Sequence, residues 1–323
     1  MQVEPRCLTV LATYKCTAEC KECCFESSPR LKQRLTLEEI KSAIRQAHRS
    51  FPSIEVVVFS GGETFLLKDD LISAIAYATE LGLLTRCVTN GFWGKAEHVA
   101  HRTVQSLVAA GLTEINISTG ADHQEFVPFA SVETASRCLV EGKIRTLVTI
   151  EADKPDGVCM ETALNSPIFG TLLREQPGLF SLQSNSWMPF KTNYEDRRVS
   201  LARGSLETGC KQLLTNIVVT PYKKMSACCG LTFEHIPELT LGDLNDENMT
   251  SLYEMARKDF LKIWIHTDGP SVIMRKLFGE DIDDDLAQFK HICQACVVLH
   301  KHPTVRAEIR RRYAESMPDV LAR

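Results

Sequence analysis

The sequence predicts an α/β protein in which helices cover a parallel β-sheet. Runs rich in β-branched residues alternate with runs of helical periodicity along the first half of the chain. This alternation is typical of parallel strands, because each connection between two parallel strands needs a crossover that a helix usually supplies. The chain has 323 residues, 44% of them hydrophobic. It can therefore bury the core of one large domain, with or without a smaller partner.

The expected strands and helices follow one another in regular order. Thr36 lies three residues before Glu39 in a capping-box pattern, and Gly82 and Gly111 fall where two helices should stop. We expect strands at 7–12, 54–62, 83–91, 114–120 and 145–152, and helices at 36–51, 67–82 and 96–111.

The second half of the chain has a different pattern. After residue 152, Gly and Pro in PDGV, SPIFG and QPG interrupt the alternation. A β-like segment, NIVVTPYKKMSACCG, and two helix-like segments follow. We therefore expect a boundary near residue 205, with a core domain over 1–205 and a smaller domain over 206–323.

Composition and charge argue against several classes of protein. The net charge is -4, which gives no general attraction to nucleic acid or to an anionic membrane. The basic stretch HKHPTVRAEIRRRY is expected to be a solvated helix face. No apolar run approaches the roughly 18 residues of a membrane span, and the first expected strand leaves no room for a secretion signal. We expect a cytoplasmic protein that binds neither nucleic acid nor membrane.

Thirteen cysteines are many for a cytoplasmic protein. Thiols there are kept reduced, so clustered cysteines indicate metal or redox chemistry rather than disulfides. Isolated cysteines are expected to be buried as small hydrophobic residues, and this applies to Cys7, Cys87, Cys138 and Cys159. Eight others lie in tight groups: Cys16, Cys20, Cys23 and Cys24; Cys228 and Cys229; Cys293 and Cys296.

The first group follows the first expected strand directly, in the spacing CxxxCxxC. In parallel α/β folds, functional groups lie on the loops after the carboxyl ends of strands. Three thiolates of one loop, those of Cys16, Cys20 and Cys23, can hold a [4Fe-4S] cluster and leave one iron open. A structural zinc site would need a fourth Cys or His nearby, and none with that spacing occurs before Cys87.

The second expected strand ends in SGGE, at residues 60–63. Gly61 and Gly62 would let the backbone approach a ligand closely, and the Glu63 carboxylate can accept hydrogen bonds from a ligand amine. Two glycines after a strand usually form only a tight turn. Their position one strand after CxxxCxxC makes the pattern more specific.

CTAECKEC, the aromatic Phe25 just after it, and SGGE resemble the radical S-adenosylmethionine (radical SAM) enzymes. The resemblance implies a partial (β/α)6 TIM-like barrel with a [4Fe-4S] cluster on the three cysteines. It also implies that SAM chelates the fourth iron and yields a 5'-deoxyadenosyl radical, which abstracts hydrogen from a C–H bond. The residues expected to bind the cofactor are Phe25, Ser60, Gly61, Gly62, Glu63 (at the SAM amino group), Asn90 and Ser118.

CCFESSP, NGFWG, SACCG and ICQAC are similar to radical SAM peptide epimerases and related enzymes that modify ribosomally made peptides. This implies a C-terminal SPASM/twitch-like domain with an auxiliary [4Fe-4S] cluster, although a four-cysteine zinc site uses the same ligands. In the epimerases the second cysteine of the adjacent pair donates hydrogen. That residue would be Cys229, unless it is only a small buried side chain. The implied cluster ligands are Cys210, Cys228, Cys293 and Cys296.

One motif departs from the epimerase pattern. Those enzymes carry SxDxxH after the fourth strand, whereas this chain reads NISTGADHQEF. Ser118 and His123 match the pattern, and Gly120 stands at the Asp position. Asp122 is a candidate replacement, displaced by two residues.

Three functions are compatible with these patterns. The first is a peptide epimerase that converts an L- to a D-residue, with a precursor peptide as substrate and a flavodoxin or ferredoxin as electron donor. The second is a cross-linking or oxidative maturase that uses the auxiliary cluster to form a thioether or carbon–carbon bond, so that its product is lighter by two hydrogens. The third is a non-catalytic iron-sulfur or zinc protein. SGGE beside CxxxCxxC argues against the third.

Overall fold

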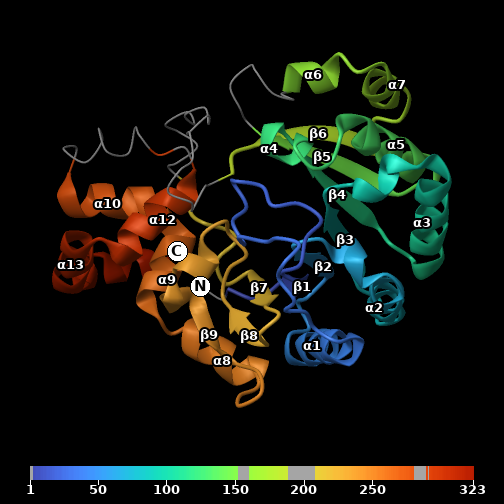
Figure 1. Cartoon of the computed structure of the whole chain (residues 1–323). Helices are drawn as coiled ribbons and strands as arrows, with labels where there is room; N and C mark the ends of the chain where they lie inside the picture. The colour runs from blue at the N-terminus through green and yellow to red at the C-terminus, as the bar shows by residue number, and fades with distance from the viewer. Residues whose placement is uncertain (1–2, 152–159, 188–207, 280–288, 290) are drawn as a thin grey trace.

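A nine-stranded sheet forms the centre of the protein in a computed structural model that describes residues 3–151, 160–187, 208–279, 289 and 291–323 (Figure 1). The strand order is β6-β5-β4-β3-β2-β1-β7-β8-β9. Cys159 and the boundary expected near residue 205 lie outside the described residues.

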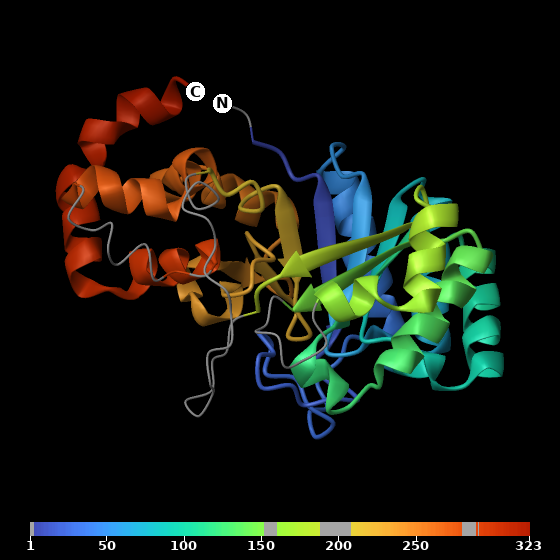
Figure 2. The same ribbon diagram turned by 90° about the horizontal axis from the view of Figure 1, so that it is seen from above.

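The first six strands are parallel neighbours with helices along their outer side (Figure 2). This arrangement confirms the expected α/β fold with a parallel sheet. The strands are β1 (Cys7–Thr13), β2 (Val56–Gly61), β3 (Leu84–Thr89), β4 (Glu114–Thr119), β5 (Arg145–Glu151) and β6 (Phe180–Asn185). The helices are α1 (Leu37–Ser50), α2 (Asp69–Glu80), α3 (Glu97–Ala110), α4 (Ala121–Gln124), α5 (Phe129–Glu141), α6 (Met160–Leu164) and α7 (Pro167–Glu175).

Local sequence explains where several helices begin and end. The side chain of Thr36 accepts from the Glu39 amide, and the Glu39 side chain accepts from the Thr36 amide, so the capping box is present. Gly111 ends α3 in the left-handed conformation, which glycine adopts without a steric cost. These ends fix how each connection returns to the sheet.

The expectation that alternation fades after residue 152 is wrong for the described part of that region. SPIFG starts a helix: the Ser166 side chain accepts from the Phe169 amide, and Pro167 occupies the first turn of α7. The strand β6 follows and pairs with β5. Most β6 residues are exposed or half-buried, as suits an edge strand, and for that reason β6 lacks a recognisable apolar pattern.

The C-terminal part extends the same sheet. The strand β7 (Asn216–Val219) pairs in parallel with β1, and β8 (Lys224–Ser226) and β9 (Thr240–Asp243) continue antiparallel. No described helix has both the length and the apolar character needed to cross a bilayer. The C-terminal helices gather beside β7 to β9 (Figure 1) and are α8 (Met249–Ala256), α9 (Phe260–Asp268), α10 (Pro270–Phe278), α12 (Ile292–Lys301) and α13 (Pro303–Leu321).

Candidate active site

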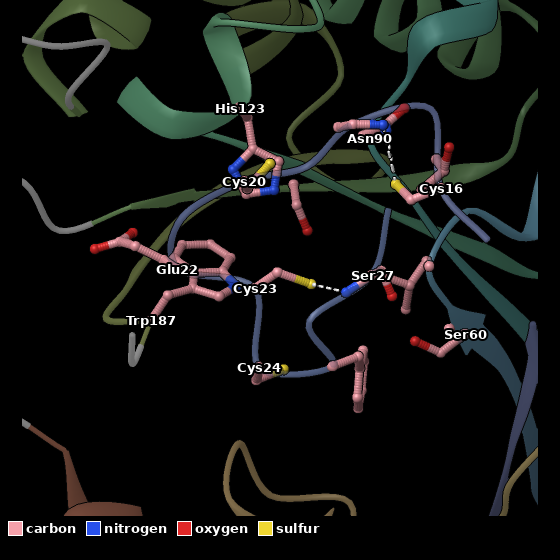
Figure 3. A pocket seen from close by; sticks show the side chains of 17 residues that line it. Cys16, Cys20, Glu22, Cys23, Cys24, Ser27, Ser60, Asn90, His123 and Trp187 are labelled. Atoms are coloured by element: carbon pink, nitrogen blue, oxygen red, sulfur yellow. Dashed lines mark hydrogen bonds between the residues drawn. The ribbon is translucent and has the colours of Figure 1, made fainter. Parts of the chain in front are cut away.

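A cavity lies at the carboxyl ends of the parallel strands, under the loop that follows β1 (Figure 3). Its volume is about 120 Å³, and it opens to solvent on one side. Residues from the ends of β2, β3 and β4 and from the loop contribute to its wall. The structure brings nine of the expected site residues together there: Cys16, Cys20, Cys23, Phe25, Ser60, Gly61, Gly62, Asn90 and Ser118.

The environment of the three loop thiols suits metal ligation. The Cys16 sulfur accepts from the Ala18 amide at 3.4 Å, and the Cys23 sulfur accepts from the Ser27 amide at 3.3 Å. Such N–H···S contacts favour thiolates. Burial raises the pKa of Cys16 to about 12, so a bound cation is needed to deprotonate this thiol near neutral pH. The donor set therefore fits an iron-sulfur cluster.

Gly61 and Gly62 anchor this loop to β2. A Cβ at Gly61 would lie 2.3 Å from the Thr13 carbonyl oxygen, and one at Gly62 would lie 2.4 Å from that of Lys15. The Gly62 amide donates to Thr13 at 2.7 Å, and the Glu63 amide donates to Lys15 at 2.9 Å. The sequence argument expected close approach to a ligand, and the structure adds a close approach to the loop backbone itself.

Glu63 lies beneath the cavity and is not among the described residues that line it. Its carboxylate accepts hydrogen bonds from the Thr89 hydroxyl at 3.0 Å, the Asn90 amide at 2.9 Å and the Phe65 amide at 3.0 Å. Burial raises the pKa of Glu63 to about 7 against the opposing effect of these bonds. In this structure Glu63 therefore ties the ends of β2 and β3 together, whereas the sequence argument expected it to contact the SAM amine.

Asn90 joins the cavity wall to the cysteine loop. Its side-chain amide donates to the Thr17 hydroxyl at 3.0 Å and points toward the Cys16 sulfur at 3.8 Å (Figure 3). The sequence argument assigned no function to several other lining residues. Trp187 was missed because it follows β6, a strand that the sequence pattern did not predict. Cys24 was given no role because Cys16, Cys20 and Cys23 already supply the three ligands expected for a cluster. Further lining residues without an expected role are Glu22, Ser27, Val88 and Thr89.

A second group of thiols gathers in the C-terminal part. Sulfur atoms of Cys228 and Cys293 both lie 3.1 Å from the point where a Gly230 side chain would begin, so this glycine leaves room for them. Burial is the main cause that raises the pKa of Cys228, Cys293 and Cys296, and neighbouring thiols add to it. The group is Cys210, Cys228, Cys293 and Cys296, and it can hold a four-ligand cluster or a zinc ion.

Two further thiols lie near these groups in contrasting positions. The Cys229 sulfur contacts the Gln212 side-chain oxygen at 3.4 Å, and Cys229 is not among the described residues that line the cavity. Cys24 does line the cavity, and its thiol is close enough to Cys23 and Cys293 for their charges to interact. Cys24 is therefore near a member of each cysteine group.

A second hollow adjoins the cavity, and Phe25 lines both. In its wall the Tyr14 hydroxyl donates to the Glu234 carboxylate. Burial raises the pKa of Glu234 to about 7. The hollow lies between the cysteine loop and the hairpin of β7 and β8, where a long molecule could extend out of the cavity.

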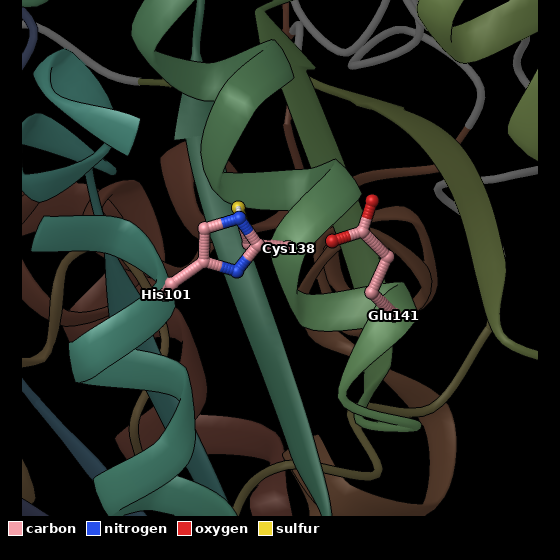
Figure 4. Close-up of side chains that lie close together, drawn as sticks. All are labelled: His101, Cys138 and Glu141. Carbon is pink, nitrogen blue, oxygen red and sulfur yellow. Dashed lines mark hydrogen bonds between the residues drawn. The ribbon is translucent and has the colours of Figure 1, made fainter. Parts of the chain in front are cut away.

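His101, Cys138 and Glu141 form a separate cluster between α3 and α5 (Figure 4). The Cys138 sulfur lies 3.9 Å from His101 Nε2. Arg137 donates to Glu141 at 3.0 Å and to Glu97 at 2.7 Å. We interpret the proximity of these three side chains as part of the ion-pair network between α3 and α5, not as a metal site. Cys138 is buried, as the sequence argument expected.

Comparisons with known proteins agree with the site. Residues 10–130 match the Radical SAM superfamily. YydG of Bacillus subtilis (strain 168), a protein named for peptide biosynthesis, is 26% identical over 170 residues, and the match covers 50% of this chain and 51% of YydG. The chain thus spans about half the length of this relative.

Solved structures share the fold at low identity. Streptococcus suis SuiB bound to precursor peptide SuiA matches with a TM-score of 0.58 and 12% identity, covering 78% of this chain and 65% of SuiB. The structure of anSMEcpe with bound AdoMet and Cp18Cys peptide matches with a TM-score of 0.57 and 15% identity, covering 98% and 99%. These likenesses support the partial TIM barrel. Residues 10–130 are thus similar to the radical SAM superfamily, and the chain shares its fold with these solved structures.

Proposed function

We propose that this protein is a radical SAM enzyme that modifies a precursor peptide by converting one L-residue to a D-residue. The observation that carries the proposal is a three-cysteine cavity that adjoins a second hollow and has a thiol, that of Cys24, in its wall beyond the three ligands. A peptide is supported as substrate because the relative YydG is named for peptide biosynthesis and because SuiB and anSMEcpe were solved with peptides.

Each part of the site would have a distinct role. Cys16, Cys20 and Cys23 would hold a [4Fe-4S] cluster, and SAM bound there would supply a 5'-deoxyadenosyl radical. The backbone of Gly61 and Gly62 would contact the methionyl end of SAM. Additional contacts to SAM are proposed for Phe25, Ser60, Asn90 and Ser118, with Glu63 beneath them. The C-terminal thiols of Cys210, Cys228, Cys293 and Cys296 would hold an auxiliary [4Fe-4S] cluster.

Inversion needs a hydrogen donor on the opposite face of the peptide. Once the α-hydrogen is removed, a cysteine thiol gives a hydrogen atom to the α-carbon and becomes a thiyl radical. The thiyl radical then takes up one electron and one proton to restore the thiol. SAM cleavage consumes a further electron, so one turnover uses two electrons and one proton. A flavodoxin or ferredoxin would supply the electrons, and the solvent would supply the proton. Cys229 is the donor by resemblance, and Cys24 competes with it because it lines the cavity.

Single variants in deuterated buffer test this proposal. The substrate would be a candidate precursor peptide, sought among the short reading frames beside the gene for this chain, and the readouts are peptide mass, D-residue content and 5'-deoxyadenosine. Wild type should add about one mass unit, because a thiol carries one exchangeable hydrogen. Cys229→Ala should keep its iron and its SAM cleavage and yield no D-residue, whereas the remote variant Cys138→Ala should behave as wild type.

The other outcomes are equally informative. Loss of the D-residue in Cys24→Ala alone, with iron retained, would keep the epimerase and move the donor to Cys24. A product lighter by two hydrogens would replace the epimerase with a cross-linking maturase. Wild-type protein that neither binds iron nor cleaves SAM would overturn the whole proposal.

A further inference from the structure

The end of β5 supplies a carboxylate to the space above Gly120. Gly120 follows β4 with φ +154, and a Cβ there would lie 2.1 Å from Glu151 Oε2 and 2.5 Å from the Glu151 Cβ. No larger side chain fits at position 120 while Glu151 keeps this conformation. The missing Asp and the presence of Glu151 are thus two parts of one arrangement.

Both carboxylate oxygens of Glu151 make hydrogen bonds with residues at the start of α4. Glu151 is buried, with Oε1 2.7 Å from His123 Nδ1 and Oε2 accepting from the Asp122 amide at 3.3 Å. His123 lines the cavity, as Cys20 does, and packs edge-on against Trp187, with 5.6 Å between ring centroids (Figure 3). Glu151 itself lies behind this wall and therefore acts on the cavity through His123.

Asp122 is a poorer replacement for the missing Asp. Its carboxylate accepts from the Glu22 amide at 3.2 Å, which ties α4 to the cysteine loop. Among the described lining residues of the cavity, Asp122 is absent whereas His123 is present. The carboxylate nearest to position 120 is thus that of Glu151.

We propose that Glu151 replaces the missing Asp as a positioning residue, which holds the His123 ring so that Nε2 can hydrogen-bond the ribose hydroxyls of SAM. This rests on the proposed function, in which the methionyl end of SAM lies at Gly61 and Gly62. The same cavity continues to Ser118 at the end of β4 and to His123, so the rest of an elongated ligand would lie beside His123. A carboxylate on Nδ1 fixes both the orientation and the tautomer of the imidazole, and so leaves Nε2 for the ligand.

Calorimetric titration of SAM into reconstituted full-length protein tests this inference. Glu151→Ala and His123→Ala should each weaken SAM binding about tenfold, the loss of roughly one hydrogen bond. Because the two residues act as a unit, the double variant should bind no more weakly than either single variant. Iron content and the thermal midpoint of the cluster-free protein should stay near wild type. Glu125→Ala, an exposed carboxylate at the end of α4 bound to Lys21, is the matched control and should bind SAM as wild type.

Two further variants keep the test decisive if Glu151→Ala folds poorly. Glu151→Gln keeps an oxygen for His123 and should weaken binding only about threefold. Gly120→Ala should weaken SAM binding at least as much as Glu151→Ala, because its methyl would lie 2.1 Å from Glu151 Oε2 and 2.5 Å from the Glu151 Cβ, so that both the carboxylate and the backbone must move. In assays of SAM cleavage the effect should appear in KM for SAM more than in kcat. Wild-type affinity in both Glu151 variants, or additive losses with His123→Ala, would overturn the role of Glu151. Absence of SAM binding by wild type would instead overturn the proposed function on which it rests.

Discussion

The two cysteine groups differ in how the chain builds them. Cys16, Cys20 and Cys23 come from one loop and line the cavity, whereas the second group is assembled from three distant segments and is absent from the described lining of that cavity. A cavity allows another molecule to reach a ligand set. This difference is why we propose the first group as the place of reaction and the second as a site for electron transfer or for stability.

The largest expected effect comes from removing the ligands of the first cysteine group, which tests directly whether the two groups differ in function. Replacing Cys16, Cys20 and Cys23 together by Ala should remove half of about eight irons, the content of two cubane clusters, and abolish 5'-deoxyadenosine formation. Iron analysis and product assay after anaerobic reconstitution measure both. The matched Cys210, Cys228, Cys293 and Cys296 alanine variant should lose the other half and retain SAM cleavage. If the first variant keeps all its iron, our assignment of the two groups is wrong.

A smaller change should disturb the first group without touching its ligands. Gly62→Ala places a methyl 2.4 Å from the Lys15 carbonyl oxygen, so the root of the cysteine loop must move. We expect reduced iron in the first cluster, a several-fold weaker SAM titration and an intact second cluster. Gly178→Ala is the control, because nothing lies within 4 Å of a Cβ there. Equal iron in both variants would show that the loop tolerates the shift.

The smallest expected effect concerns the contact between the two regions, where Tyr14 of the first loop meets Glu234. Burial raises the pKa of Glu234 from 4.5 to about 7. The folded protein therefore holds this proton between these pH values while the unfolded chain does not, and the free energy of unfolding falls as pH rises through that window. Glu234→Gln should reduce this decrease in the free energy of unfolding by about 1 to 3 kcal/mol. Urea unfolding at pH 5 and pH 8 measures it, with Glu238→Gln as control. An unchanged pH dependence would mean that Glu234 is ionised throughout.

The first region was largely predictable because its signals are local. The spacing of Cys16, Cys20 and Cys23 after a β-branched run, and the glycines one strand later, depend on neighbours in the chain. The capping box of α1 was equally readable. In the second group only the CxxC pair of Cys293 and Cys296 has a local spacing signal. Cys210 and Cys228 could be joined to it only by resemblance, because no spacing rule links them to α12 across the intervening elements.

What the sequence did not reveal depends on packing between elements. Glu151 is the last residue of β5 and the last but one of the strand expected at 145–152, so it shares the carboxyl edge of the sheet with Ser118. That position could have singled it out. Its contact with the space above Gly120 requires the register of β4 and β5. Trp187 was hidden because β6 is an exposed edge strand without apolar alternation. The burial of Glu63 was also not predictable, because its three hydrogen-bond donors come together only in the folded protein.

The pairing of β7 with β1 sets a mechanical limit on the molecule. Four register pairs, from Cys7 with Asn216 to Val10 with Val219, join the two regions through one backbone ladder. A hinge motion between the two cysteine groups would have to break this ladder. The distance between the groups should therefore change little. If both groups hold clusters as we propose, an electron that passes between them would cross a nearly constant distance.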